Sequence, residues 1–590
     1  MSRRFFLIFA LLWLLVATSI AAQTPFTEVS GALGITRLAP IPGDHHSPGA
    51  LFVDLDGDGF PEIYICRGDP LGGPAPIRNE LYRNVASPTG RAYQLLATSG
   101  AEDGGDSTGA IAADYDNDGD VDIYVLNFDS PNTLLQNQLA QGGGLTFIDV
   151  TLATDPTPAP SLPDGQFGVG WAIDAASGIL LDNSLTASFF DANKDGFVDL
   201  YVGNHNGYAP FVTIEGPDPR PGRRDVFYLN NGNGTFTDVT TTMPGTPLTG
   251  FETPAGLGTT VNQRYSSTNA AVAFDANNDN WIDLYVTNKV GGATDADMLY
   301  INQGMVAGVW QGFRNVSYGA GTGFATATPA AMGVAVGDWN NDLIFDTYTT
   351  DTGPNDLHTG TLVGGLPVYI TTSVAPLSGL FAWGAEYFDF DNDGLIDLYV
   401  GNNTPPGQMI SDHLFWNLPT GFVEVSLLAG IQPPTQGNDT RGVMTADYNK
   451  DGWVDVLTIP MVSGQITLLQ NNVSTLFPQN TWLHLKLVGN PGAAGPLRST
   501  ADAIGARAFV SADLNGDGVI RPGETMMREV VAGSSNAGST SSLKLEFGTG
   551  LAATASVRIQ WPSGATTAVT ATPTSRCLTI SELTGLGGPC

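Results

Sequence analysis

The stretch DFDNDGLIDLYVGN, residues 389–402, decides the fold, because its first nine residues are one of seven copies of a single pattern. The pattern reads Asp-x-Asp/Asn-x-Asp-Gly/Asn/Leu-x-x-Asp/Glu. The copies are loops 1 to 7, and they begin at Asp54, Asp114, Asp191, Asp275, Asp338, Asp389 and Asp447. Seven copies in one chain, each leading into a strand-like run, indicate a repeat architecture.

Each loop offers oxygen ligands for a hard cation such as Ca²⁺. Side chains at positions 1, 3, 5 and 9 can converge on one ion, the carbonyl at position 7 adds a fifth oxygen, and water completes the shell. A turn this tight needs positive φ at position 6, where Gly is least strained. Leu343 stands there in loop 5, so we expect a weak or empty site, whereas Asn280 in loop 4 tolerates that conformation.

An eighth loop near the C-terminus reads DLNGDGVIRPGE, residues 513–524. Its spacing matches the EF-hand loop, with Glu524 as a possible bidentate ligand. The flanks read as strands, so we expect an EF-type loop in a hairpin; the alternative is a polar turn whose acids are solvated. The predicted ligands in loops 1 to 8 are Asp54, Asp56, Asp58, Phe60, Glu62; Asp114, Asp116, Asp118, Asp120, Asp122; Asp191, Asn193, Asp195, Phe197, Asp199; Asp275, Asn277, Asp279, Trp281, Asp283; Asp338, Asn340, Asp342, Asp346; Asp389, Asp391, Asp393, Leu395, Asp397; Asp447, Asn449, Asp451, Trp453, Asp455; and Asp513, Asn515, Asp517, Val519, Glu524.

Four strand signals accompany most loops. A strand of small residues precedes the loop, and an apolar run such as LYVGN follows it. Next come a short strand near an Asn, such as DVFYLNNG at 225–232, and a strand of the type FTDVT at 236–240. Four-stranded units at this spacing are typical of propeller blades. The seventh unit lacks its fourth strand, so we expect FTEVS at 26–30 to complete it and to protect its edge.

The predicted fold class is all-β, with a seven-bladed β-propeller carrying calcium loops over residues 24–478. A linear array of independent calcium modules is the alternative. A small C-terminal β domain follows over residues 479–590, where WLHLKLVG, IGARAFVSA, MMREVVAG, LKLEFGTG and ASVRIQWPSG read as strands. Trp281, Trp339 and Trp453 lie inside metal loops, and we expect them to pack between blades.

The amino-acid composition argues against some classes of function. The 590 residues include 24 Lys and Arg against 58 Asp and Glu, a formal charge of −34. Nucleic acid and anionic membrane surfaces need a basic footprint that this chain lacks. Residues 1–22 read as a secretory signal peptide, with Arg3 and Arg4 before the apolar run from Phe5 to Ala17. An uncleaved anchor is the alternative. No other stretch is long and apolar enough to cross a bilayer.

Three cysteines exclude a disulfide framework. Cys577 and Cys590 could tie down the C-terminal tail, a pairing that the sequence leaves open, and Cys66 follows a strand-like run and reads as a buried thiol. The Arg220, Arg223 and Arg224 spot could bind a partner or be a solvated loop. Residues 155–186 interrupt the third unit with Pro and Gly and could form an excursion over one propeller face.

The loops followed by LYVGN and LYVTN resemble the FG-GAP/VCBS repeats of integrin-α-type propellers. The stretches IGARAFV, REVVAGSSNAGSTSS, LKLEFGTGLA and VRIQWPSG resemble the ASPIC/UnbV domain. Together they are similar to the cartilage acidic protein family and its bacterial relatives, over nearly all of the mature chain. The resemblance implies an extracellular calcium-binding protein. The EF-type loop looks like an insertion into the usual ASPIC/UnbV pattern.

The sequence contains few motifs that indicate catalysis. The six histidines show no metal-ligand spacing, and the pair His45–His46, which could line a propeller mouth, is more often structural or solvated. We therefore expect a secreted, monomeric calcium-binding protein for adhesion or extracellular ligand binding, or a periplasmic or surface protein in a bacterium. Calcium is structural, at up to eight sites. The expected partner is a glycan, matrix component or protein. The alternatives are a calcium-dependent lyase or hydrolase acting on carbohydrate, and a structural coat protein.

Overall fold

The computed structural model describes residues 24–35, 49–67, 78–128, 130–154, 183–205, 225–245, 268–288, 297–317, 331–351, 353–372, 382–402, 411–431, 440–460, 466–533 and 538–590. The regular secondary structure of the described chain is almost entirely β-strand, which confirms the predicted all-β class. No helix among these residues is long and apolar enough to cross a membrane. The predicted signal peptide, His45–His46, the arginine spot and residues 155–182 of the predicted excursion lie outside the described ranges.

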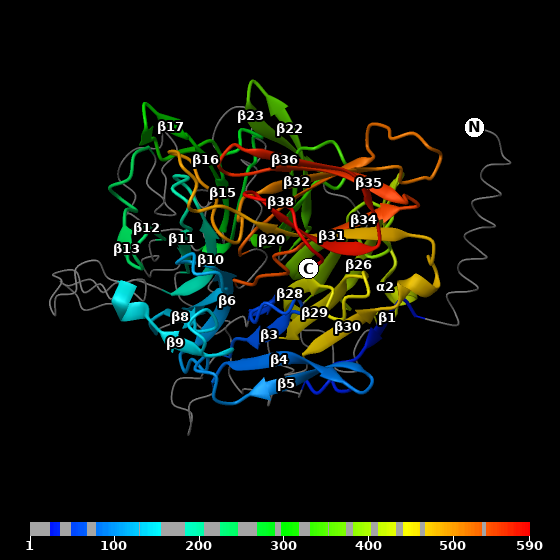
Figure 1. Ribbon diagram of the computed structural model, residues 1–590, viewed down its shortest axis with the longest axis horizontal. Coiled ribbons are helices and arrows are strands. Elements are labelled where there is room, and N and C mark those ends of the chain that lie inside the picture. Colours follow the sequence, from blue (N-terminus) through cyan, green and yellow to red (C-terminus); the bar gives the residue numbers. More distant parts are fainter. Residues whose placement is uncertain are drawn as a thin grey trace.

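Seven antiparallel sheets of four strands form the first part of the chain (Figure 1), here called the seven-sheet array. Sheets 1 to 3 are β2 (Ala50–Val53), β3 (Glu62–Ile65), β4 (Glu80–Ser87), β5 (Gly90–Leu96); β6 (Ser107–Ala113), β7 (Asp122–Asn127), β8 (Thr133–Asn137), β9 (Phe147–Asp149); and β10 (Ser184–Phe190), β11 (Asp199–Asn204), β12 (Val226–Asn230), β13 (Phe236–Asp238). Every unit runs first strand, metal loop, second strand, as the sequence predicted.

The remaining sheets repeat this order. Sheets 4 to 6 are β14 (Thr268–Phe274), β15 (Asp283–Asn288), β16 (Met298–Asn302), β19 (Phe313–Asn315); β20 (Ala331–Gly337), β21 (Asp346–Asp351), β22 (Asp356–Val363), β23 (Leu366–Thr372); and β24 (Ala382–Phe388), β25 (Asp397–Asn402), β26 (His413–Leu418), β27 (Gly421–Glu424). Smaller elements are the hairpin β17 (Met305–Val306) and β18 (Val309–Trp310), the 3-10 turns η1 (Thr151–Thr154) and η2 (Val473–Thr475), and the short helix α2 (Ser426–Ala429).

The seventh sheet joins the two ends of the array. It comprises β28 (Thr440–Ala446), β29 (Asp455–Pro460), β30 (Thr467–Asn471) and, as its outer strand, β1 (Phe26–Glu28) from the start of the chain. This is the pairing that the missing fourth strand predicted. The first strands of neighbouring sheets also lie against one another, in the order β2, β6, β10, β14, β20, β24, β28 and back to β2.

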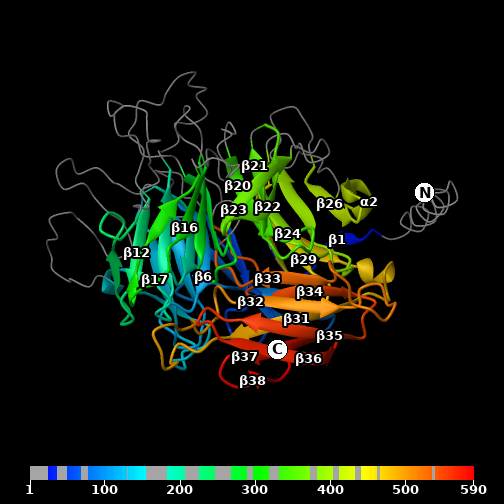
Figure 2. The same cartoon turned by 90° about the horizontal axis from the view of Figure 1, so that it is seen from above.

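The C-terminal segment, residues 481–590, forms two further four-stranded sheets, which Figure 2 shows on one side of the array. Their strands are β34 (Leu545–Gly550), β31 (Thr481–Val488), β37 (Arg576–Ser581), β38 (Gly585–Leu586); and β33 (Thr525–Glu529), β32 (Arg507–Ala512), β35 (Thr554–Gln560), β36 (Thr566–Pro573). The five strands that the sequence predicted are present. A disulfide joins Cys577 to Cys590, and Cys66 is a buried free thiol.

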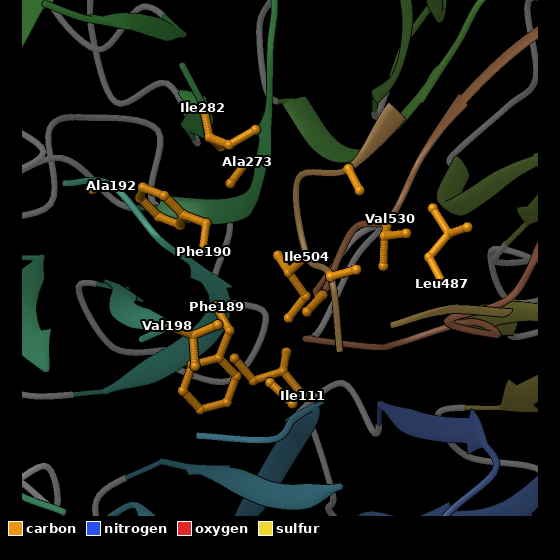
Figure 3. Packing of buried hydrophobic residues seen from close by; sticks show 14 of the residues in the cluster. Ile111, Phe189, Phe190, Ala192, Val198, Ala273, Ile282, Leu487, Ile504 and Val530 are labelled. Carbon is orange, nitrogen blue, oxygen red and sulfur yellow. The ribbon is translucent and has the colours of Figure 1, made fainter. Parts of the chain in front are cut away.

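A hydrophobic core runs from the array into the C-terminal segment. One cluster of buried side chains includes Ile111, Phe190 and Ile282 of the array together with Ile504 and Val530 of the C-terminal segment. Figure 3 shows Phe190 and Ile282 on one side of this contact and Val530 on the other, with Ile504 between them. The two parts therefore share apolar packing, in addition to the polar contacts described below.

Residues 538–542 of the C-terminal segment lie along the first strands of the array. The amide of Phe52 in β2 donates to the carbonyl of Thr540 at 3.0 Å, and the amide of Ala110 in β6 donates to the carbonyl of Gly538 at 2.7 Å. On the far side, the Ser542 amide donates to the carbonyl of Thr445 in β28 at 3.1 Å. The C-terminal segment is therefore hydrogen-bonded to the first strands β2, β6 and β28.

Candidate metal centres

The backbone of each loop has two left-handed residues. The residue at position 6 has positive φ in all eight loops, as predicted, and Leu343 is no exception at 67°. Position 4 is also left-handed, which the sequence analysis missed. Its residues are Gly57, Asn117, Lys194, Asn278, Asn341, Asn392, Lys450 and Gly516. Two of these eight residues are Gly and four are Asn, which tolerates this conformation, so Lys194 and Lys450 are the two that the surrounding structure must hold in a strained conformation.

The carboxylate at position 1 organises the loop from within. In loop 3 the amide of Asp195 donates to Asp191 Oδ1 at 3.1 Å, and the amide of Gly196 donates to Oδ2 at 2.8 Å. The same pair of bonds, to positions 5 and 6, occurs in loops 2, 4, 5, 6, 7 and 8. Loop 1 has the bond to position 6, from Gly59 to Asp54 Oδ2. The position-1 oxygens are therefore held in fixed directions.

The carboxylate at position 9 joins the loop to its sheet. Asp199 accepts hydrogen bonds from the amide of Ala192 at position 2 and from the amide of Asn230 in the third strand, at 3.0 and 2.9 Å. All seven array loops repeat this bridge. Burial, which disfavours the charged form, raises the pKa of Glu62 to about 9 and that of Asp346 to about 8, and neighbouring carboxylates of the same loops add to the shift.

In six of the seven sheets, an asparagine at the third strand links the loop to the loop of the preceding sheet. Asn230 Nδ2 donates to the carbonyl of Val198 in its own loop at 3.1 Å and to the carbonyl of Tyr115 in loop 2 at 2.9 Å. Five other sheets have the same link, through Asn84, Asn137, Asn302, Asn417 and Asn471. Sheet 5 has Gly360 at that position. The recurring Asn was visible in the sequence, but its role was not predicted.

Position 4 supplies a second link, in the opposite direction. Asn117 Nδ2 of loop 2 donates to the carbonyl of Gly196 in loop 3 at 2.8 Å. Asn278, Asn341 and Asn392 make the same bond to position 6 of the following loop. Lys450 of loop 7 donates to the Asp58 carbonyl of loop 1 at 2.9 Å. The loops are therefore coupled to one another around the array.

The predicted acidic ligands converge most closely in three loops. Carboxylate oxygens lie within 4.8 Å of one another in the groups Asp54–Asp56–Asp58, Asp114–Asp116–Asp122 and Asp389–Asp391–Asp397. These three loops have Asp at position 3. The other loops have Asn there, so an amide oxygen replaces one charge. Trp339 and Trp453 pack against aromatic or apolar side chains of a neighbouring sheet, as predicted.

Loops 1 and 2 contain buried carboxylate oxygens without hydrogen-bond donors, which could hold a cation. Asp54 Oδ1, Asp116 Oδ1 and Asp120 Oδ1 are buried and accept no hydrogen bond. An uncompensated carboxylate oxygen in such a place is costly, whereas Ca²⁺ takes six to eight oxygens at about 2.3–2.6 Å. The donor set, all carboxylate, amide and carbonyl oxygen, suits Ca²⁺ better than a soft metal.

Loop 1 differs from loop 2 in its neighbours. In loop 1, Arg83 lies 2.6 Å from Asp56 Oδ2 and Arg91 lies 4.0 Å from Asp58. In loop 2, the neutral amide of Gln136 donates to Asp116 Oδ2 at 2.6 Å, and no ion pair with Lys or Arg reaches this loop in the described part of the chain. Loop 1 thus has built-in positive charge, and loop 2 lacks it.

The eighth loop has the predicted hairpin setting between β32 and β33 and is more exposed than the others. Asp513 makes the two position-1 bonds described above. Glu524 accepts hydrogen bonds from Asn515 Nδ2 at 2.9 Å and from the amide of Arg521 at 2.6 Å. The Arg521 guanidinium lies 2.6 Å from Asp517 Oδ2. Its three acids do not form one of the close carboxylate groups found among the described residues.

The C-terminal segment lies directly on the metal loops. Arg507 Nη2 is 2.8 Å from Asp275 Oδ2 in loop 4, with both side chains almost fully buried. The Gly550 amide donates to the carbonyl of Asn392 in loop 6 at 2.9 Å. A Cβ atom added to Gly548 would lie 2.1 Å from Asp389 Oδ2. The FGTG stretch therefore needs its first glycine so that β34 can approach loop 6.

Comparisons with known proteins agree with the two parts of the chain. A family model described as ASPIC and UnbV matches residues 495–586, and one described as FG-GAP-like repeat matches residues 54–125 and 389–458. The chain therefore carries an ASPIC/UnbV domain and FG-GAP-like repeats, which confirms the resemblance found in the sequence. The comparison with curated proteins finds no match.

Solved structures give distant likenesses. An Agrocybe aegerita lectin that recognises non-reducing terminal N-acetylglucosamine is 14% identical, with 64% of this chain and 79% of that chain covered and a TM-score of 0.36. Rhamnogalacturonan lyase YesW is 12% identical, with 75% of each chain covered and a TM-score of 0.35. BBS1N, in complex with ARL6DN, is 12% identical over 74% of this chain and 96% of that chain, with a TM-score of 0.35. These values are too low to support an argument about the site.

Proposed function

We propose that this chain of FG-GAP-like repeats and an ASPIC/UnbV domain is a secreted calcium-binding protein for adhesion or extracellular ligand binding. The seven sheets are the blades of a closed seven-bladed propeller over residues 24–478, and residues 479–590 form a second domain. Contacts between successive first strands, and the pairing of β1 with β30, support closure. Calcium is structural at up to eight loops, and loop 5 binds it most weakly because Leu343 is strained at φ 67°.

The observation that carries the calcium proposal is the set of buried, unpartnered carboxylate oxygens in loops 1 and 2. Each loop presents its predicted ligands from a backbone that hydrogen bonds already hold in place. A cation would satisfy these oxygens without rearranging the chain, and it would stabilise the folded protein because the unfolded chain has no such sites.

The adhesion proposal rests on the scaffold. Links between neighbouring loops and strand closure make a rigid platform, and rigid platforms present surface loops to partners. The expected partner is an extracellular glycan, a matrix component or another protein. The disulfide between Cys577 and Cys590 is consistent with an oxidising, extracellular or periplasmic location.

The test is binding of the mature protein to a glycan and matrix-protein array, in millimolar calcium and again in EGTA. We expect one class of partner to bind in calcium and binding to fall in EGTA. If the folded protein, verified by thermal unfolding, binds no component of the array in either condition, the adhesion proposal is contradicted. A calcium-dependent carbohydrate-active enzyme is the alternative.

A further inference from the structure

The metal-loop acids lie beneath the C-terminal segment. Asp114, Asp389 and Asp447 are each at most 3% exposed. Asp447 faces His484 Nδ1 at 3.7 Å, and its amide donates to Glu546 Oε1 at 3.2 Å. Water cannot hydrate these carboxylates while the segment is in place. Each of the three accepts two amide hydrogen bonds within its loop, but its charge is still removed from water. Without a cation that charge is better accommodated in water, so the loops favour separation from the segment.

The contacts across this interface also depend on the loop conformation. The Arg498 amide donates to the carbonyl of Lys194 at 2.9 Å, and Lys544 Nζ donates to the carbonyl of Gly59 at 2.7 Å. Asn480 Nδ2 donates to the carbonyl of Asp391 at 2.8 Å. These acceptors belong to positions 3, 4 and 6, where the backbone is left-handed or next to a left-handed residue. A loop that relaxes would withdraw them.

We propose that cation binding in the loops and docking of the C-terminal segment are coupled, so that filled loops hold the segment and chelation loosens it. This inference rests on the proposed calcium binding and adds a regulatory role for the same sites. Coupling of this kind is reciprocal, so the docked segment raises the affinity of the loops for calcium by the same factor.

The segment supplies cations of its own to two loops: Lys486 lies 3.8 Å from Asp54 Oδ2 in loop 1, and Arg507 makes a buried contact in loop 4. The Arg507 guanidinium contacts Asp275 and also donates from Nη1 to Asn278 Oδ1 at 2.5 Å. Its Nε lies 3.9 Å from Glu529, a further acid of the segment. Arg507 therefore holds the segment on loop 4 even without calcium, and its loss would make docking depend more strongly on the metal.

Loop 2 has the opposite arrangement. The segment places Asp502 beside it, with Oδ2 accepting the Asp114 amide at 2.9 Å. Asp502 thus adds another carboxylate to a loop that already holds Asp114, Asp116, Asp118, Asp120 and Asp122. No Lys or Arg ion pair offsets it among the described residues. Docking at loop 2 is therefore the contact that calcium supports most.

Hydrogen exchange on the full chain tests the coupling. The interface amides are Arg498 and Gly550, whose acceptors lie in loops 3 and 6. The reference amide is Val510 in β32, which lies between β33 and β35 in the same segment. We expect the ratio of protection in calcium to protection in EGTA to be about tenfold or more at the interface amides and close to one at Val510.

Two variants should move this ratio in opposite directions. Arg507→Gln removes the built-in cation, so the ratio should rise by about fivefold. Asp502→Asn removes the added charge in nearly the same shape, so the ratio should fall by a similar factor. A general loss of stability would lower protection at Val510 as well, and it would not produce opposite signs. Ratios that stay unchanged, or that move together, would overturn the coupling.

The calcium content of the same samples separates the two proposals. Calcium bound in the loops, with interface protection identical in calcium and EGTA, would overturn the coupling alone. A protein that binds no calcium would overturn the proposed function and the coupling together. Calcium binding with interface amides that lose protection on chelation, ahead of Val510, supports both.

Discussion

Asn84 Nδ2 donates a hydrogen bond of 3.0 Å to the backbone carbonyl of Tyr448, and this bond joins the first sheet to the seventh across 364 residues of sequence. Asn84 also donates to Pro61 in its own loop at 3.3 Å. One side chain therefore fixes a loop and connects it to the loop before it. Because the same link recurs in five other sheets, the loops share one hydrogen-bonded network.

Because of this network, we expect that replacing one of these asparagines lowers the free energy of unfolding considerably. Asn137→Ala would leave the carbonyls of buried Leu55 and half-buried Val121 without this donor. We expect the free energy of unfolding to fall by about 2–3 kcal/mol in saturating calcium, measured by chemical denaturation. Asn233→Ala, in an exposed turn, is the matched control and should change it by about 0.5 kcal/mol or less. Equal effects of the two substitutions would contradict the role given to the asparagine.

Strain at position 6 can be tested in loop 2. Gly119 has φ of 102°, and a Cβ atom added there would meet no other atom within 4 Å. Gly119→Leu therefore isolates the conformational cost, which we expect to be about 1–2 kcal/mol of unfolding free energy. Gly119→Asn should cost less, because Asn tolerates this conformation, as Asn280 does in loop 4. An Asn variant as unstable as the Leu variant would show that strain is not the cause.

The buried His358, which lies outside the metal loops, predicts that the stability of the fold depends on pH. Burial lowers its pKa from 6.5 to about 4, because the neutral ring, bonded to Thr371, is favoured in the folded protein. Unfolding therefore takes up a proton below pH 6.5, so this contribution to stability is complete above pH 6.5. It falls by about 3 kcal/mol as the pH drops to 4.

His358→Gln should remove that slope. The measurement is the difference in unfolding free energy between wild type and variant at pH 7 and at pH 4.5, both in saturating calcium. Because the carboxylates titrate in both proteins, their effect cancels in the difference. A difference that is the same at the two pH values would contradict the buried, neutral histidine.

The states of the three cysteines predict how many thiols per chain react with a thiol reagent. Cys66 is buried, and burial raises the pKa of its thiol, so the native protein should not react with a thiol reagent. After denaturation without reductant, one thiol per chain should react, because Cys577 and Cys590 are paired. After reduction all three should react. Three reactive thiols in the unreduced, denatured protein would contradict the disulfide.

Much of the architecture could be predicted because it is periodic. The loop pattern, the four strand signals and the missing fourth strand of the seventh unit all lie within short stretches, and together they predicted the sheets and the β1–β30 pairing. Positive φ at position 6 followed from the turn alone. The left-handed residue at position 4 was missed because Lys194, Lys450 and several Asn residues stand there instead of Gly.

The contacts between distant parts could not be predicted. Nothing in the neighbourhood of Arg507 indicates that it will face Asp275, and nothing near Asp502 indicates loop 2. Such pairs depend on how the C-terminal segment lies on the array, which is a property of surface shape and not of local pattern. The FGTG stretch was recognised as a motif, but the close approach of its first glycine, Gly548, to Asp389 appears only in three dimensions.

The most direct test of the account is the number of calcium ions bound per purified chain at saturating calcium, measured by equilibrium dialysis with elemental analysis and by native mass spectrometry. The account predicts between five and eight ions, with loops 5 and 8 the first to be empty, and a melting temperature that falls when they are removed by EGTA. Fewer than five ions, or a melting temperature unchanged by EGTA, would contradict the claim that calcium loops hold this protein together.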